Sequence, residues 1–108
     1  MAFALTNSLS ALLSNATGAL FNFAAATTVR SVRLTNTSVS AVSGVSLFFD
    51  YDGTGTGAVD CLLSGLTLAP GESVLVDGGP FNFANGGRIS GVAGTASVIS
   101  CHITPATI

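Results

Sequence analysis

The chain has 108 residues, of which 48% are apolar and 7% are charged, and its formal net charge at pH 7 is −2. Five acids and three arginines, with no lysine, exclude a nucleic-acid partner, because a phosphate backbone is bound by clustered basic residues. The longest strictly apolar runs, Met1–Leu5 and Phe23–Ala26, are far shorter than the roughly 20 residues of a transmembrane helix. We therefore expect no membrane partner, and a surface so poor in charge predicts burial against other protein subunits.

Residues 1–27 give the least regular pattern. Ser8–Leu13 fits one helical turn, but it fits an apolar arm or an extra strand equally well. Phe21 and Phe23 are two residues apart and favour a strand. Two interpretations stay open: an arm inserted against a neighbouring subunit, or a strand of the chain's own sheet. The stretch lacks the positively charged start of a signal peptide, so no export is predicted.

Residues 28–108 alternate strand formers with turn residues at the spacing of sandwiches and barrels. The predicted strands are Thr28–Thr35, Val45–Tyr51, Ala58–Leu63, Leu66–Pro70, Ser73–Asp77, Phe81–Phe83, Arg88–Val92 and Ala96–Thr104. The glycine-rich loop Asp52–Gly57 joins two of them into a hairpin, and Pro70-Gly71 has the composition of a type II turn. The predicted fold is all-β: a single antiparallel β-sandwich, jelly-roll or immunoglobulin-like, with an apolar N-terminal arm.

Two cysteines, Cys61 and Cys101, permit one disulfide at most. Each lies among apolar neighbours in a predicted strand, where free cysteine behaves as a small buried hydrophobe. Buried, reduced thiols are the favoured interpretation, and a bridge between the two strands is the alternative.

No cofactor and no catalytic group are predicted. The single histidine, His102, is adjacent to Cys101, and neighbouring residues of a strand point to opposite faces, so the two cannot form a nucleophilic pair. Asp50 and Asp52, with Asp60 across the hairpin, are weak candidates for a calcium site, since calcium takes six to eight oxygen ligands. The favoured interpretation is a hairpin tip, and the chain is not expected to be an enzyme.

Two segments match the acceptor pattern for N-glycosylation, Asn15-Ala16-Thr17 and Asn36-Thr37-Ser38. Because no export signal is predicted, both are interpreted as chance matches.

Three segments together resemble a known group of proteins. They are VRSVRLTNTSVSAVSGVSLFFDYDG from Val29, LTLAPGESVLVDGGPFNF from Leu66, and RISGVAGTASVISCHI ending at Ile103. The set is similar to small β-sandwich virion proteins of tailed bacteriophages, whereas residues 1–27 lie outside the resemblance. The resemblance implies a structural role in the particle, so no active-site residue is carried over.

The resemblance and the scarcity of charge together predict a capsid decoration (cement) protein, located in the virion and assembled in the bacterial cytoplasm. Its expected partners are the major capsid protein and copies of itself, as a trimer or dimer. The alternative is a tail or fibre component, with a host-glycan site near Asp50, Tyr51 and Asp52. The residues predicted to face neighbouring subunits are Phe3, Leu5, Leu9, Leu12, Phe21, Phe23, Phe81 and Phe83.

Overall fold

The structure, a computed structural model, describes residues 4–5, 9–53, 61–76 and 80–107, which form strands, turns and no helix. The strands are β1 (Ala4–Leu5), β2 (Leu9–Leu12), β3 (Gly18–Asn22), β4 (Thr27–Asn36), β5 (Val42–Asp50), β6 (Cys61–Leu68), β7 (Ser73–Val76), β8 (Phe81–Phe83), β9 (Arg88–Val92) and β10 (Ile99–Thr107). In this part of the chain there is accordingly no helical segment with the length and hydropathy needed to cross a membrane.

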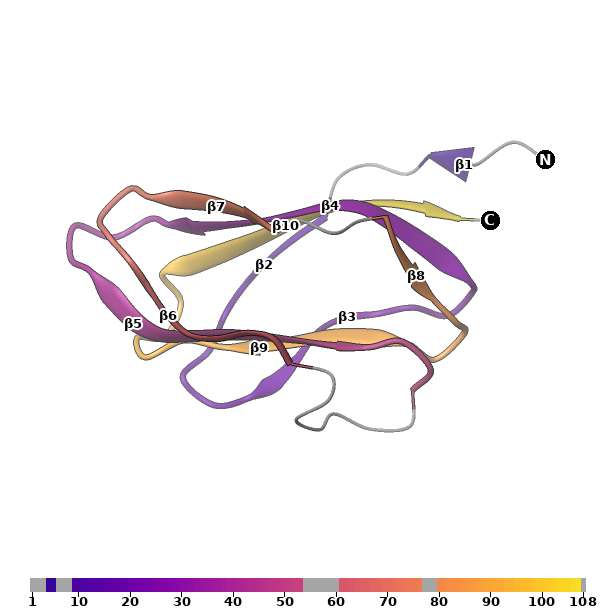
Figure 1. The fold of residues 1–108 in the computed structure, drawn as a ribbon, viewed down its shortest axis with the longest axis horizontal. Coiled ribbons are helices and arrows are strands. Elements are labelled where there is room, and N and C mark those ends of the chain that lie inside the picture. The colour runs from indigo at the N-terminus through magenta and orange to yellow at the C-terminus, as the bar shows by residue number, and fades with distance from the viewer. Residues whose placement is uncertain (1–3, 6–8, 54–60, 77–79, 108) are drawn as a thin grey trace.

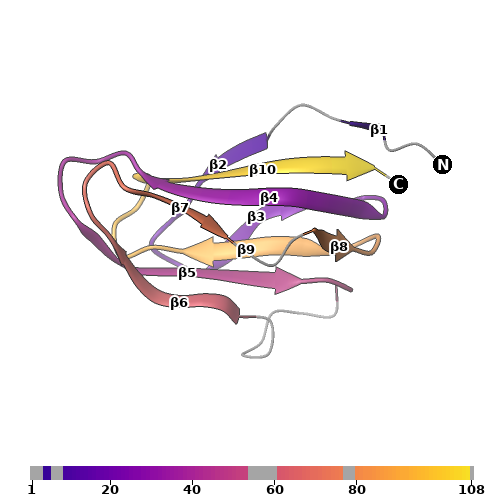
Figure 2. The same ribbon diagram turned by 45° about the horizontal axis from the view of Figure 1, so that its top comes forward.

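The strands form two antiparallel sheets that pack face to face, so the predicted β-sandwich is confirmed (Figure 1). Sheet A has β10 and β4 at its centre; β1 and β2 pair with β10, while β7 and β8 pair with β4. Sheet B has the order β3-β9-β5-β6. Figure 2 shows that β6 and β7 lie on one long side of the sandwich, and β2 and β3 on the other.

Most strand pairs join segments that are distant in sequence. Among the described strands, only β5 and β6 are both consecutive and hydrogen-bonded to each other. The central pair of sheet A aligns Leu34 with Cys101 and Val32 with Ile103. Because β4 and β10 are distant in the sequence, their pairing depends on long-range contacts that the local sequence pattern does not encode.

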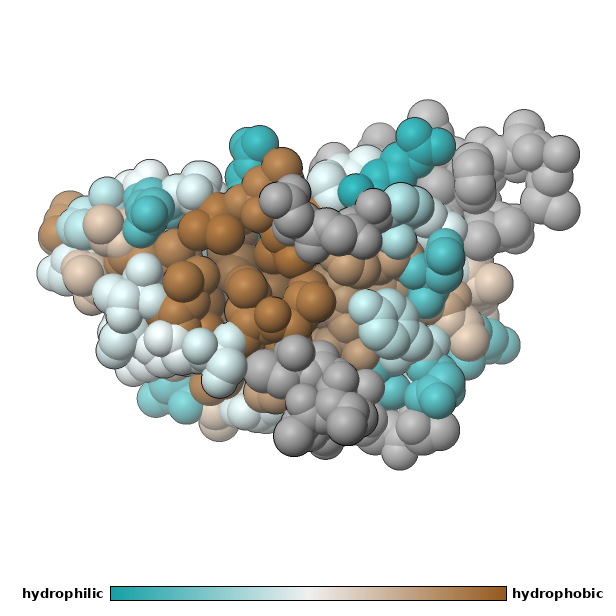
Figure 3. Space-filling model, viewed as in Figure 1, coloured by the Kyte–Doolittle hydropathy of each residue, from teal (hydrophilic) through white to brown (hydrophobic). Residues whose placement is uncertain are grey.

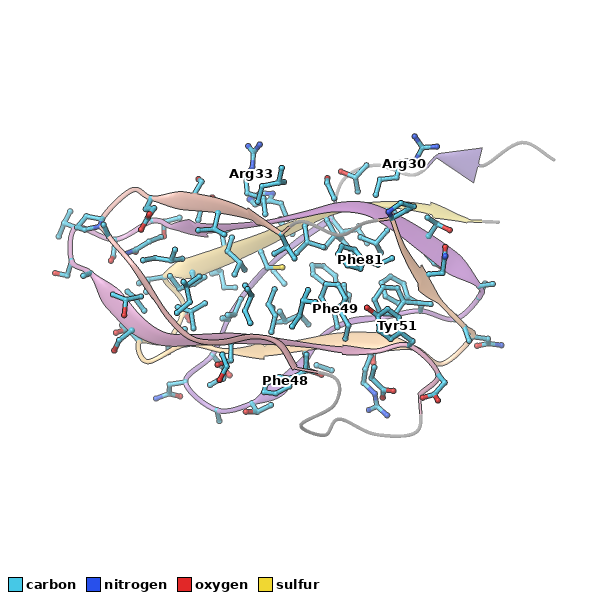
Figure 4. All side chains as sticks on the ribbon, in the orientation of Figure 1. Arg30, Arg33, Phe48, Phe49, Tyr51 and Phe81 are labelled. Carbon is cyan, nitrogen blue, oxygen red and sulfur yellow. The ribbon has the colours of Figure 1, made fainter. Side chains whose placement is uncertain are left out.

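The core lies between the two sheets and is made of the inward-facing residues of both. Phe49 is fully buried at its centre and meets Phe81 edge to face, with ring centroids 4.8 Å apart. Tyr51 closes one end, where it stacks on Phe83 at 5.1 Å and keeps 41% of its surface exposed. Figure 4 shows Phe49, Tyr51 and Phe81 between the sheets and Phe48 on the outer side of sheet B.

Of the alternatives left open for Ser8–Leu13, the structure shows the extra strand and not the helical turn in the described part. Leu9–Leu12 is strand β2, which pairs with Ile103–Ser100 of β10. One edge of β10 pairs with β4, and β2 pairs with the other edge. A strand at this position satisfies the backbone N–H and C=O groups of that second edge, whereas a helix would leave them without partners. Since β3 likewise pairs with β9, residues 9–12 and 18–22 are strands of the chain's own sheets.

Two of the other predicted strands match and the rest are found with different ends, while residues 58–60 of the predicted Ala58–Leu63 and Asp77 of the predicted Ser73–Asp77 lie outside the described residues. Phe81–Phe83 and Arg88–Val92 match as predicted. The break predicted between Leu63 and Leu66 is absent, because Gly65 takes a positive φ of 64° and lets β6 continue. The turn at Pro70-Gly71 is confirmed by the φ of 74° at Gly71 and by a hydrogen bond from Glu72 N to Ala69 O.

Candidate interaction surface

The outer face of sheet A carries a row of side chains that runs across four strands. The register aligns Ser10 of β2 with His102 of β10, His102 with Arg33 of β4, and Arg33 with Leu75 of β7. Residues directly opposite each other on paired strands share a face. Arg33 and His102 are both exposed, and Figure 4 shows Arg33 pointing away from the sandwich.

A hollow of about 370 Å³ is centred on this row. The described residues that line it are Ser31, Arg33, Thr35, Leu75, His102 and Thr104. His102 is therefore a surface residue. Its ring makes a 2.8 Å hydrogen bond with Ser100 Oγ, through Nε2.

Hydroxyl groups around the hollow are paired with one another. Ser31 Oγ donates to Thr104 Oγ1 at 3.2 Å, and the hydroxyls of Thr35 and Ser73 lie 2.8 Å apart. These bonds cross from β4 to β10 and from β4 to β7, so they hold the face of the sheet in one arrangement. Arg33, in contrast, forms no ion pair with any described residue.

Asp50 is not available as a ligand, which corrects its place in the predicted calcium and glycan sites. Its carboxylate is 1% exposed, and Oδ2 lies 3.1 Å from Arg88 Nε. Its Oδ1 accepts a hydrogen bond from Gly53 N at 3.0 Å. A burial this deep is tolerated because the charge is paired and hydrogen-bonded.

The other acids of the predicted calcium site do not complete it in the described structure. Asp52 is exposed, and Asp60 lies outside the described residues. Within those residues no group of three metal-ligating side chains occurs.

Cys101 is a free and fully buried thiol in β10, as expected. Burial removes the water that would solvate a thiolate, and it raises the pKa of Cys101 to about 12. The group is therefore an unreactive part of the core. Cys61 lies in β6, opposite Phe48, and its side chain is outside the described residues.

The prediction that four phenylalanines face neighbouring subunits is wrong. Phe21, Phe23, Phe81 and Phe83 are only 8%, 7%, 6% and 2% exposed. Phe21 lies in β3, which pairs with β9, and Phe81 and Phe83 lie in β8, which pairs with β4. Phe23 follows β3 and its backbone N donates to the Gly87 oxygen, and all four rings belong to the chain's own core. Alternation in the sequence shows that Phe21 and Phe23 share a face, but it does not say which face is inside.

Two other predicted interface residues are exposed. Leu9 and Leu12 of β2 are 44% and 52% exposed, and the sequence analysis missed Leu75 of β7, which is 55% exposed. Leu12 and Leu75 lie at opposite sides of the outer face of sheet A, because they align with Ser100 and Arg33. Phe3 and the side chain of Leu5 are outside the described residues. The role of Leu9 and Leu12 as contact residues stays a prediction.

A second apolar area lies on the long side of the sandwich between β6 and β7 (Figure 3). Leu62, Leu63 and Leu66 of β6 and Val74 of β7 pack against the core there and stay partly exposed. Both strands are edge strands, and neither contains a charged residue or a proline. Natural proteins normally place such residues on an edge to prevent pairing with another chain.

Asn36 of the Asn36-Thr37-Ser38 pattern is buried at 0% exposure. Its Nδ2 donates to the carbonyl oxygens of Ser40 and Leu68, at 2.8 and 3.1 Å. A side chain held in this way is not accessible for glycosylation, in agreement with a chance match. Asn15, in the other pattern, is exposed.

The sequence predicts no site at Arg33, although a signal for its outward position was present. In TVRSVRLT, Val32 and Leu34 are apolar and Arg33 lies between them, which places the arginine on the opposite face from the core. Which residues of β7 and β10 flank it depends on long-range register and is seen only in the structure.

The fold thus defines a class, a single antiparallel β-sandwich in which sheet A has a hydroxyl-rich outer face and the edge strands β2, β3, β6 and β7 carry no charged residue. Comparison with protein-family models, curated proteins and solved structures found no match to the chain.

Proposed function

We propose that the chain is a structural protein of a tailed-bacteriophage virion, bound in many copies to the outside of the capsid as a decoration protein. The observation that carries the proposal is the apolar long side between β6 and β7, where two edge strands meet without a charge. Such a surface is covered by protein when the molecule works. The resemblance of Val29–Ile103 to virion proteins of tailed bacteriophages is the reason for proposing a virus particle as the place where this surface is covered.

Composition supports the same proposal. A domain that works alone in water devotes about a quarter of its residues to charged side chains, whereas this chain devotes 7%. The partners we propose are the major capsid protein and further copies of the chain. Each interface of ordinary size buries on the order of 1,600 Å² in total, and repetition over a closed lattice adds these contributions. The proposal contains no catalytic step and no cofactor.

The alternative role, a glycan-binding module of the tail or fibre, has less support. Asp50 is committed to Arg88 and Gly53, and one face of the Tyr51 ring is stacked on Phe83. Two of the three side chains named for a sugar site are therefore already engaged in the chain's own packing.

Copy number tests the proposal. Particles from the genome that encodes the chain are purified, and stained bands are compared with that of the major capsid protein. We expect hundreds of copies per particle, near one for each shell subunit. A few tens of copies per particle would refute the decoration role and favour a tail component. Absence of the chain from the particle would refute any role in the virion.

A matched pair of variants tests the edge. Thr67→Lys places a charge on β6, where Thr67 is exposed, and Thr95→Lys places the same charge in an exposed loop. A lysine on an edge strand opposes pairing with another chain. We expect T67K to lower the copies per particle at least tenfold and T95K to leave them unchanged, with equal melting temperatures. Equal occupancy for both would show that this edge is not used.

A further inference from the structure

The outer face of sheet A is a second surface, separate from the β6–β7 edge, and its chemistry is different. At its centre is Arg33, one of only three basic side chains other than histidine in the chain. Arg88, by comparison, is paired with the buried Asp50. An arginine that forms no ion pair with the described residues and lies in a hollow is the feature to explain.

Every other polar group identified around the hollow has a partner within the sheet. Ser31 bonds Thr104, Thr35 bonds Ser73, and His102 bonds Ser100. These hydrogen bonds hold the side chains around the guanidinium to one another. The planar fork of Arg33 remains available for a bidentate contact, which matches the geometry of a carboxylate.

The surroundings of Arg33 indicate the kind of molecule that supplies the carboxylate. Leu12 and Leu75 are each more than half exposed, and they flank the polar centre on β2 and β7. Arginine is enriched at protein–protein interfaces, and exposed apolar side chains beside it provide surface that a partner protein can bury. A sugar site normally contains a Phe, Tyr or Trp ring for stacking, and none of the described residues that line the hollow is one of these.

We propose that the outer face of sheet A docks on a partner protein, whose aspartate or glutamate side chain enters the hollow and pairs with Arg33 while Leu12 and Leu75 pack around it. That the partner is the capsid shell rests on the proposed function. That the surface binds a carboxylate of a protein does not rest on it, and this binding can be tested on the isolated chain.

The first experiment uses particles assembled without the chain, to which purified variants are added back. Arg33→Gln removes the charge from the hollow, and Arg30→Gln removes the same charge from an exposed arginine of the same strand. We expect R33Q to weaken binding at least tenfold, R33K to lie between R33Q and the wild type, and R30Q to stay within twofold. Equal binding of R33Q and wild type would overturn the docking inference and leave the decoration role intact.

The second experiment needs no particle, so it still decides the inference if the wild-type chain fails to bind capsids and the proposed function falls. The backbone amide ¹⁵N signals of β4, β7 and β10 are followed while a capped tetraglutamate peptide is added, and separately glucuronate. We expect saturable shifts with the peptide that are absent in R33Q and unaffected in R30Q. Tighter binding of glucuronate would identify a glycan site instead, and no shift with either probe would refute the inference.

Discussion

Asn36 offers the sharpest test of how this fold is held together. Its side chain is fully buried at the end of β4, where it links the loop before β5 to the turn between β6 and β7. Nδ2 donates to the carbonyls of Ser40, Leu68 and Ala69 at 2.8, 3.1 and 3.2 Å. Oδ1 accepts from the backbone N and the hydroxyl of Ser38, at 2.9 and 2.8 Å. One amide therefore satisfies groups from two segments that are distant in the sequence.

Replacing Asn36 with alanine removes all five contacts. Ser38 and Ser40 are partly or fully exposed, so water replaces the amide there at a cost of about 0.5 kcal/mol for each bond. The Leu68 carbonyl belongs to a fully buried residue, where water cannot replace the lost hydrogen bond, and this costs about 2 kcal/mol. The expected loss in the free energy of unfolding is about 4 kcal/mol, a large part of the 5–15 kcal/mol typical of a domain. Asn36→Asp should lose at least as much, because a carboxylate cannot donate to three carbonyls.

Urea denaturation followed by far-ultraviolet circular dichroism measures this loss. Asn22→Ala is the matched control, since Asn22 lies on β3 with its side chain exposed, and it should change the free energy by less than about 0.5 kcal/mol. The urea slope should stay constant, which shows that the same surface is exposed on unfolding. If N36A and N36D lie within 0.5 kcal/mol of N22A, the amide does not hold these segments together and the reasoning is refuted.

Three further predictions follow from other contacts. Arg88→Met removes the arginine that pairs with the buried Asp50 carboxylate and should lower the free energy of unfolding by about 2 kcal/mol. The double variant D50N/R88M should recover part of this loss, and losses that add in a double-mutant cycle would contradict coupling between the two side chains. A Cβ at Gly53 would lie 2.6 Å from the Gly86 oxygen, so Gly53→Ala should lower the melting temperature more than Gly65→Ala, where φ is also positive but no atom lies within 4 Å; equal shifts would exclude the clash. With a pKa near 12, Cys101 in a Cys61→Ser chain should resist a thiol reagent at pH 8 until the protein is unfolded, and rapid labelling of the native chain would disprove its burial.

The sequence by itself determined the class of fold and the position of most strands. Alternation of apolar and polar residues marks β4, β5 and β8, because a strand with one buried face must place its side chains with a period of two. Pro70-Gly71 marks a turn for an equally local reason, since proline presets φ and glycine accepts a positive φ. These properties depend on neighbouring residues only.

Only the tertiary structure decided which face of each strand lies inside and which side chains meet. Four phenylalanines that were predicted to contact other subunits are instead part of the core: Phe21, Phe23, Phe81 and Phe83. The pairing of β3 with β9 and of β8 with β4 places these rings between the two sheets. The pairing of β4 with β10 brings Arg33 beside His102, although the two residues are far apart in the chain. A pattern with a period of two is the same for either face, so the choice depends on long-range register. That register places Arg88 against Asp50 and leaves Arg33 on the open face of sheet A.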